Sequence, residues 1–306
     1  MATYLARRLL FSVFVLLGVL TALFFILRVL PGDPAAIMLG AAADREMVER
    51  QREIMGLDRP LAAQYVTYLG QVVTGDWGLS LHERRPAMTL VIQRLPATAE
   101  LAFAGLAVAL VVGFALGITA ALQANTLLDR LISSLSLVGQ AIPNFWLGIV
   151  LILVFSRMLE WLPTFGRGTW AHLVLPVATL AVQLIGVTTR LVRSGMLDVL
   201  ATDYVRTARA KGAAEARVIQ HHAIKNMLIP VITVLGVQLG TLLGGAVVLE
   251  TVFAWPGLGR LIVSAIDNRD YPVVQAAVTV IALIFVVLNL LVDLVYAYLD
   301  PRIRYG

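Results

Sequence analysis

The stretch that decides the fold is LAFAGLAVALVVGFALGITAALQANTLL, residues 101–128, which carries no charged side chain between Glu100 and Asp129. About 20 apolar residues in a helix cross the hydrocarbon core of a bilayer, so this run is long enough to span a membrane. The other charge-free runs, working outward along the chain, are 9–27, 131–156, 173–189, 226–249 and 271–292. Together they predict an all-α polytopic membrane protein with six transmembrane helices.

The composition supports this class. Hydrophobic residues make up 59% of the chain and charged residues 14%, whereas soluble domains have roughly 45–50% and 25%. A soluble globule, a disordered chain and a coiled coil are therefore disfavoured. The chain has no cysteine, which excludes disulfides, thiolate metal sites and a cysteine nucleophile. Its net charge of +5 fits cations gathered on the cytoplasmic side of a membrane. No basic cluster alternates with aromatic residues, so we expect no nucleic-acid partner.

The loop charges predict the orientation. Run 9–27 is longer than the core of a signal peptide and no small-residue cleavage site follows it, so we interpret it as an uncleaved first span. Arginine and lysine exceed the acidic residues in the short segments that lie inside if the N-terminus is cytoplasmic. Six spans then return the C-terminus to the cytoplasm. The two long connections, 31–96 and 192–225, are expected outside and inside, respectively.

Several catalytic motifs are missing from the sequence. The two lysines follow Ala210 and Ile224, so the phosphate loop GxxxxGK[ST] is absent, and neither HExxH nor GxSxG occurs. We therefore expect no enzyme activity, no metal and no cofactor in this chain; any ATP would be hydrolysed by another subunit. No carboxylate lies at the centre of a predicted span, which weighs against a secondary carrier driven by protons or sodium.

Small and polar residues in the spans suggest packing faces and a solute path. Close helix packing in membranes uses small residues at four-residue spacing. Such spacing occurs in the second run at Gly113 and Gly117, and in the fifth at Gly236, Gly240 and Gly244. The few polar residues of the fourth and fifth runs give candidates for the path: Gln183, Gln238 and Thr241.

The most informative segment is the predicted inner loop DYVRTARAKGAAE, residues 203–215. It predicts a helix, a break at Gly212, and a second helix that starts near Ala213 and continues toward the fifth span. A break of this kind lets a short helix lie across the membrane surface. The same composition is also typical of an ordinary basic amphipathic surface helix, so residue types alone leave the two interpretations open.

This loop resembles the cytoplasmic coupling loop of permease subunits of binding-protein-dependent ABC importers, in the dipeptide/oligopeptide/nickel family. Residues 203–212 match that family's D-Y-[IV]-R-T-A-R-A-K-G throughout, and 222–230 match the following H-A-[LI]-[KR]-N-x-[LM]-[IL]-P. Arg206 stands where the wider superfamily has Glu, which is typical of the peptide branch. The resemblance to the first of the family's two permease types covers nearly the whole chain. Its other supporting segments are LPGDP (30–34), GLDRPL (56–61), GDWGLS (75–80), RLPAT (94–98), AIPNF (141–145), ETVFAWPGLG (250–259) and DPRIR (300–304).

The resemblance implies a fold, a function and partners. The fold is a type I ABC importer transmembrane domain, with the first helix and outer loop in 1–96 and a five-helix core in 97–300. The function is half of the path by which an ATP-driven importer of the bacterial inner membrane takes up di- or oligopeptides; nickel, glutathione and oligosaccharides are alternatives. The implied partners are a second permease, two ATP-binding subunits, which bind ATP and Mg²⁺, and an extracytoplasmic solute-binding protein.

The resemblance also implies roles for particular residues. The ATPase-coupling residues are Asp203, Tyr204, Arg206, Thr207, Ala208, Arg209, Lys211, Gly212, Ala213 and Glu215. The residues expected to form an outer gate and to meet the binding protein are Glu250, Phe253, Trp255, Pro256 and Gly257. A stand-alone channel or carrier, which would transport without ATP, is the competing class; a membrane scaffold without a solute path is the third.

Overall fold

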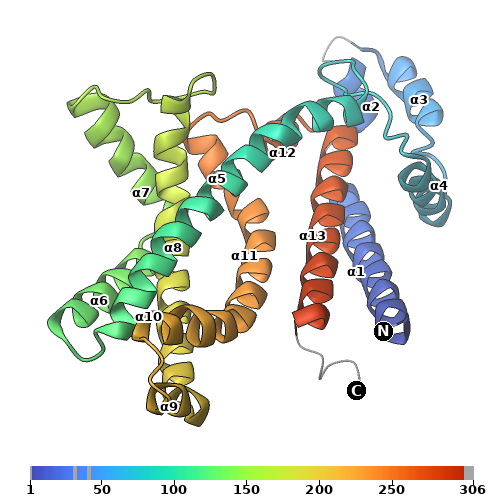
Figure 1. Cartoon of the computed structure of the whole chain (residues 1–306). Coiled ribbons are helices and arrows are strands. Elements are labelled where there is room, and N and C mark those ends of the chain that lie inside the picture. The colour runs from blue at the N-terminus through green and yellow to red at the C-terminus, as the bar shows by residue number, and fades with distance from the viewer. Residues whose placement is uncertain (1, 30–32, 40–42, 300–306) are drawn as a thin grey trace. The chain divides into compact units, whose positions relative to one another are not determined.

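The computed structural model describes residues 2–29, 33–39 and 43–299, and within these ranges the chain is almost entirely helical (Figure 1). The pairing of Leu79 with Pro86 is an isolated β-bridge. The elements are α1 (Ala2–Val29), α2 (Pro34–Leu39), α3 (Arg45–Ile54), α4 (Leu61–Thr74), α5 (Ala87–Leu122), α6 (Leu127–Ala141), α7 (Asn144–Leu151), the π-helix η1 (Ile152–Met158), α8 (Trp170–Leu200), α9 (Asp203–Ala210), α10 (Glu215–Arg217), the π-helix η2 (Val218–Ile224), α11 (Lys225–Val252), α12 (Leu258–Asp267) and α13 (Tyr271–Leu299).

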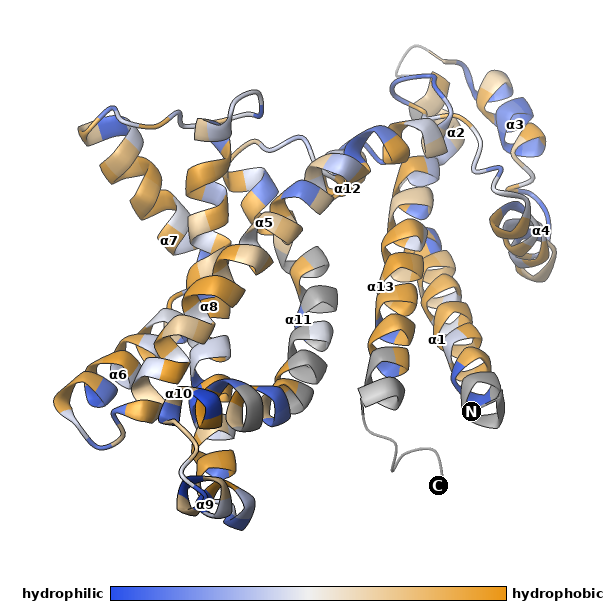
Figure 2. Cartoon of the chain, viewed as in Figure 1, coloured by the Kyte–Doolittle hydropathy of each residue, from blue (hydrophilic) through white to orange (hydrophobic). Residues whose placement is uncertain are grey.

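Five of the six charge-free runs lie on one helix or on the bent series α6, α7 and η1. Run 101–128 continues past the end of α5 through a turn to the first residues of α6. Among the described residues, α1, α5, α8 and α13 are long and apolar enough to cross a membrane, and the bent pair α6–η1 makes a fifth candidate. Run 226–249 lies on α11. Figure 2 shows apolar residues along most of α1 and α13, whereas hydrophilic residues gather on α9. The all-helical membrane class is thus confirmed, while the count of six spans and the cytoplasmic termini stay predictions.

The third run differs from a straight span. The helices on either side of Ile142 and Pro143 are bent by 99° (Figure 1). Proline disfavours the helical conformation in the residue before it, and Ile142 is indeed extended, with φ −74° and ψ 124°. Freedom from charge therefore identified an apolar segment correctly, but it gave no information about the break within that segment.

The fold has two compact units, which are described separately. The first comprises Met1–Ala97 and Pro256–Val287. Its apolar core joins α1 to the early turns of α13, and α4 packs on the same core through Tyr68. Asp270, just before α13, accepts hydrogen bonds from the Ser80 hydroxyl and from the Leu81 backbone N–H (3.1 Å). This buried carboxylate therefore ties the segment that follows α4 to the start of α13.

The second unit comprises Thr98–Trp255 and Leu288–Gly306, and α8 is packed against α6, α7, η2 and α11. Small residues allow close approach to α8. A Cβ on Gly113 would lie 2.6 Å from Thr188 Cβ, and a Cβ on Gly117 would lie 2.6 Å from Val192 Cβ. Real Cβ atoms do not approach so closely, so these glycines of α5 are required where the two helices pack.

Candidate functional site

The segment that follows α8 folds as a short exposed helix, a turn and a second helix. Thr202 occupies the N-cap position of α9, but its hydroxyl donates to the Val199 carbonyl of α8 (2.6 Å). The Thr207 hydroxyl donates to the Asp203 carbonyl (2.9 Å). Most side chains of α9 are exposed, but Val205 is fully buried. Val205 therefore anchors a helix whose charged residues, Arg206 among them, face outward.

Gly212 makes the turn between the two helices. Its φ is +79°, a left-handed conformation that favours glycine, whereas a Cβ placed there would meet nothing within 4 Å. The backbone conformation, and not a lack of space, accounts for glycine at this position. The Ala213 N–H donates to the Ala208 carbonyl (3.2 Å), which closes the end of α9.

An exposed ion pair between Arg209 and Glu215 spans the turn at Gly212. The Arg209 guanidinium donates to both carboxylate oxygens of Glu215, at 3.1 Å from Nε and 2.5 Å from Nη2. This hydrogen bonding holds the pKa of Glu215 below its ordinary value. A bidentate pair restricts both side chains more than a single contact does. The end of α9 is thus joined directly to the first residue of α10.

Two contacts connect the same segment to the following helices. The Asn226 amide of α11 donates to the Tyr204 hydroxyl (3.0 Å). α9 packs on η2, where Val218 is fully buried. The second helix starts at Glu215 and not at Ala213, and it continues through η2 into α11. The helix, break and second helix predicted from the sequence are therefore observed, with the start of the second helix shifted by two residues.

The residues expected at the outer gate are largely internal. Glu250 is 0% exposed and accepts a hydrogen bond from the Thr98 hydroxyl (2.6 Å). Phe253 and Trp255 are also buried, and the Phe253 carbonyl accepts from the Gly166 N–H (3.0 Å). These side chains hold their own unit together. Contact of a binding protein with this segment, including Pro256 and Gly257, stays a prediction.

The contacts of Arg167 with Glu100 and Trp255 were not predicted from the sequence. Arg167, in the loop before α8, pairs with Glu100 of α5 (2.5 Å from Nη2), and its guanidinium lies 5.9 Å from the Trp255 ring centroid. Arg167 therefore links the 159–169 loop both to α5 and to the end of the buried 250–255 segment.

The pathway candidates are only partly described. Gln183 is exposed on α8 and accepts a hydrogen bond from the Asn144 amide (2.9 Å), at the start of α7 beside the bend. Gln238 is half-buried on α11. Thr241 lies on the same helix, but its surroundings, like those of Gly240 and Gly244, are outside the described part. Gly236 is described, and a Cβ on it would overlap a methyl group of Val292 on α13.

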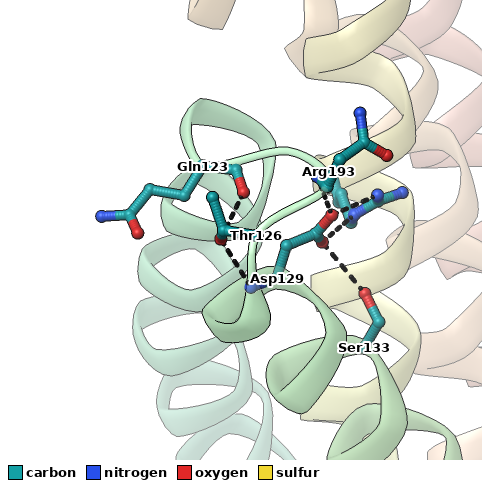
Figure 3. A network of polar contacts seen from close by, with 6 residues as sticks. Gln123, Thr126, Asp129, Ser133 and Arg193 are labelled. Atoms are coloured by element: carbon teal, nitrogen blue, oxygen red, sulfur yellow. Dashed lines mark hydrogen bonds and ion pairs between the residues drawn. The ribbon is translucent and has the colours of Figure 1, made fainter.

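A buried ion pair between α6 and α8 was missed by the sequence analysis (Figure 3). Asp129 is 3% exposed and receives Arg193 Nε at 2.5 Å and Nη2 at 2.8 Å. The Asn125 N–H (2.9 Å) and the Ser133 hydroxyl (3.3 Å) also donate to it. In the sequence, Asp129 only marks the end of an apolar run, and Arg193 is one of several cations that follow another run. They are 64 positions apart, so no local pattern indicates that they meet.

The described residues contain no cluster of three or more His, Asp or Glu side chains that would hold a metal ion. The exposed, charged helix α9 is connected to α8 and α11 by the packing of η2 and by the Tyr204–Asn226 hydrogen bond.

Comparison with known proteins identifies the family to which this chain is related. Residues 113–305 match the family described as binding-protein-dependent transport system inner membrane component. Residues 1–102 match its N-terminal counterpart. A relative named glutathione transport system permease protein GsiC, from Salmonella paratyphi A, is 44% identical over 305 residues, covering 100% of both chains. The protein of the same name from Escherichia coli K12 is 43% identical with the same coverage.

Solved structures agree at the level of the fold. A chain of the inward-facing MetNI methionine ABC transporter superposes with a TM-score of 0.61 at 18% identity, covering 70% of this chain and 97% of that one. A chain of an amino acid ABC transporter with histidines gives a TM-score of 0.50, also at 18% identity, over 70% and 94%. The chain therefore belongs to the family of binding-protein-dependent transport system inner membrane components, as a non-enzymatic permease subunit of an ABC importer.

Proposed function

We propose that this chain forms half of the translocation path of an importer for small peptides, with glutathione as the first candidate. The other half is a second, homologous permease; two ATP-binding subunits supply the energy, and an extracytoplasmic binding protein delivers the solute. Both termini and the α9–α10 segment lie in the cytoplasm, and six spans cross the inner membrane.

The observation that carries this proposal is the exposed α9, joined through the Gly212 turn to α10. Its charged side chains project from a base that a single buried valine, Val205, anchors. A partner that grips α9 would move α8 and α11 as well, because the Tyr204–Asn226 hydrogen bond and the η2 packing connect them. ATP-driven closure of the partner subunits would then switch the spans between two packings.

The choice of solute rests on the relatives. Those quoted above are named for glutathione transport, and glutathione is itself a tripeptide, so it also falls within the peptide class expected from the sequence. Nickel and oligosaccharides remain as alternatives. Titrating the cognate binding protein with glutathione, dipeptides, Ni²⁺ and an oligosaccharide separates these possibilities directly.

The coupling role is tested by reconstituting the full complex with its binding protein in liposomes. We expect ATP-dependent uptake that the permease pair alone does not show. Arg209→Glu places two carboxylates against each other at the turn; it should weaken the association of the ATPase subunits and lower uptake together. Arg45→Glu, at an exposed outer position, is the matched control. Normal ATPase association and uptake with Arg209→Glu, or uptake without ATP, would refute the proposal.

A further inference from the structure

A pocket of about 670 Å³ lies between α6 and α8, wholly within the second unit. It is set on the side of these helices that leads to the predicted cytoplasmic segment. Arg190 lies 20 positions after Trp170 at the start of α8, or about 30 Å along a helix. This length equals the thickness of the hydrocarbon core, so we place the pocket at the inner edge of the membrane. Its polar lining residues are Ser133, Gln140, Arg190, Arg193 and Ser194.

The polar groups of the pocket are mainly hydrogen-bond donors. Arg190 is exposed and donates from Nη1 to the Gln140 side-chain oxygen (3.1 Å). This bond directs the other end of the Gln140 amide, Nε2, to a buried position where it has no hydrogen-bond partner. Ser194 is exposed one helical turn after Arg190, on the same face of α8. The Arg190 guanidinium and the Ser194 hydroxyl therefore lie on the pocket side, whereas Gln140 Nε2 is turned toward Gly186 of α8 and is shielded from the pocket.

The pocket carries a positive charge, on Arg190, that no pocket-lining carboxylate neutralises. Arg193 is matched by the bidentate contact with Asp129, whereas Arg190 meets a neutral amide. The pocket-lining residues include two arginines and no carboxylate. Placing a cation near the hydrocarbon core is unfavourable, and such residues usually line a water-filled path or pair with an anion. Packing also fixes the wall above the pocket, since a Cβ on Gly186 of α8 would overlap the Ser136 carbonyl oxygen of α6.

We propose that Arg190, which is oriented by its hydrogen bond to Gln140, forms with Ser194 a binding site for an oxyanion in the pocket between α6 and α8. The ligand is a carboxylate of the passing solute or the phosphate of an anionic phospholipid in the cytoplasmic leaflet. The first source rests on the proposed function, because glutathione and other peptides carry carboxylates; the second does not. A planar guanidinium binds either group through paired N–H donors.

The absence of cysteine makes a direct test possible, because Ser194→Cys introduces the single thiol of this chain. The variant is assembled into the complete importer in nanodiscs of phosphatidylcholine, with partner subunits that lack exposed thiols. Labelling rates with an anionic and a cationic thiosulfonate reagent are then compared. Arg190→Gln should lower the ratio of anionic to cationic labelling about tenfold or more, because a unit charge one helical turn away is removed. Arg190→Lys should retain most of the ratio.

A cysteine at Ala201 provides the matched control. It is exposed at the C-cap of α8, 11 positions from Arg190, or about 16 Å, which exceeds the Debye length of about 8 Å at physiological salt. Its labelling ratio should not respond to Arg190→Gln. It also reports whether the Arg190→Gln complex has assembled normally; if it has not, Arg190→Lys and protection of the wild-type arginine decide the question.

The source of the oxyanion follows from protection in the Ser194→Cys complex. S-methylglutathione, which has no free thiol, is compared with its dimethyl ester, and nanodiscs containing phosphatidylglycerol are compared with phosphatidylcholine alone. Slower anionic labelling with the free acid identifies a solute carboxylate, and slower labelling with phosphatidylglycerol identifies a lipid phosphate. An unchanged ratio in Arg190→Gln, or no protection by either oxyanion, overturns the proposal. Labelling needs no transport, so this result is separate from the uptake assay.

Discussion

The buried pair Asp129–Arg193 gives the sharpest test of how the permease core is held together. Asp129→Asn keeps the shape of the side chain but removes its charge. The Asp129 side chain by itself is 4% exposed and the Arg193 side chain 29%, so the variant leaves the arginine largely out of water without its counter-ion. Removing one partner of a buried pair destabilises by about 3–5 kcal/mol. Because Arg193 is not fully buried, we expect the lower end, about 3 kcal/mol.

The measurement is thermal unfolding of the purified chain in detergent. At roughly 2–4 °C per kcal/mol, the midpoint Tm should fall by about 6–12 °C. The double variant Asp129→Asn/Arg193→Gln leaves no unpaired charge and should recover much of this loss. The control Asp198→Asn, at an exposed position on α8, the helix of Arg193, should change stability by less than about 0.5 kcal/mol. A fall of less than about 2 °C for Asp129→Asn, or additive effects in the double variant, would refute the reasoning.

Other predictions concern the coupling turn and a packing face. Gly212→Ala should weaken ATPase binding roughly fivefold, since a left-handed alanine costs about 1 kcal/mol, whereas Gly212→Asn should bind nearly as well; equal binding by all three forms would contradict this. The Arg209 pair lowers the pKa of Glu215, so its stabilisation of the turn is complete above the ordinary glutamate pKa of about 4.3 and is lost as pH falls through the lower folded value. A ¹³C titration of the Glu215 carboxylate should show a midpoint that Arg209→Gln raises, and identical midpoints would count against the pair. Gly236→Ala should destabilise by about 1–3 kcal/mol in thermal unfolding because its Cβ overlaps α13, whereas Gly18→Ala, which meets nothing within 4 Å, should not; equal effects would remove the packing argument.

Local features of the sequence predicted the local parts of the structure. Gly212 was identified as a break because glycine alone readily takes a left-handed conformation, and the structure has φ +79° there. The charge-free runs located the long helices but not their ends. α8 continues past Arg190 to Leu200, since a charged residue marks where a helix leaves the hydrocarbon core and does not end the helix. The bend at Pro143 was open to prediction from proline stereochemistry, but the length of the apolar run concealed it.

The contacts between distant segments could not be predicted in the same way. Asp129 directly follows an apolar run, and Arg193 comes four positions after the end of another, where charged residues are ordinary. Only the packing of α6 on α8 brings the two side chains together. The basic pocket depends on the same packing, because Arg190 and Gln140 are 50 positions apart. The burial of Glu250 was also unexpected, since the acidic residue stands at the edge of a run and looks like a surface group.

The long helix α8 is continuous, whereas the neighbouring α6–α7 pair is bent, and this difference determines how a movement is transmitted through the subunit. From Val177 to Leu200 the helix runs without an internal proline, for about 36 Å, and α9 begins three positions later, at Asp203. A continuous helix of this length moves as one stiff segment, so a displacement at its C-terminal end is transmitted to its other end. The neighbouring pair α6 and α7, which is already bent at Pro143, can change its bend angle instead. A displacement of α9 should therefore move the far end of α8 as well, while the α6–α7 pair accommodates the movement by bending at Pro143.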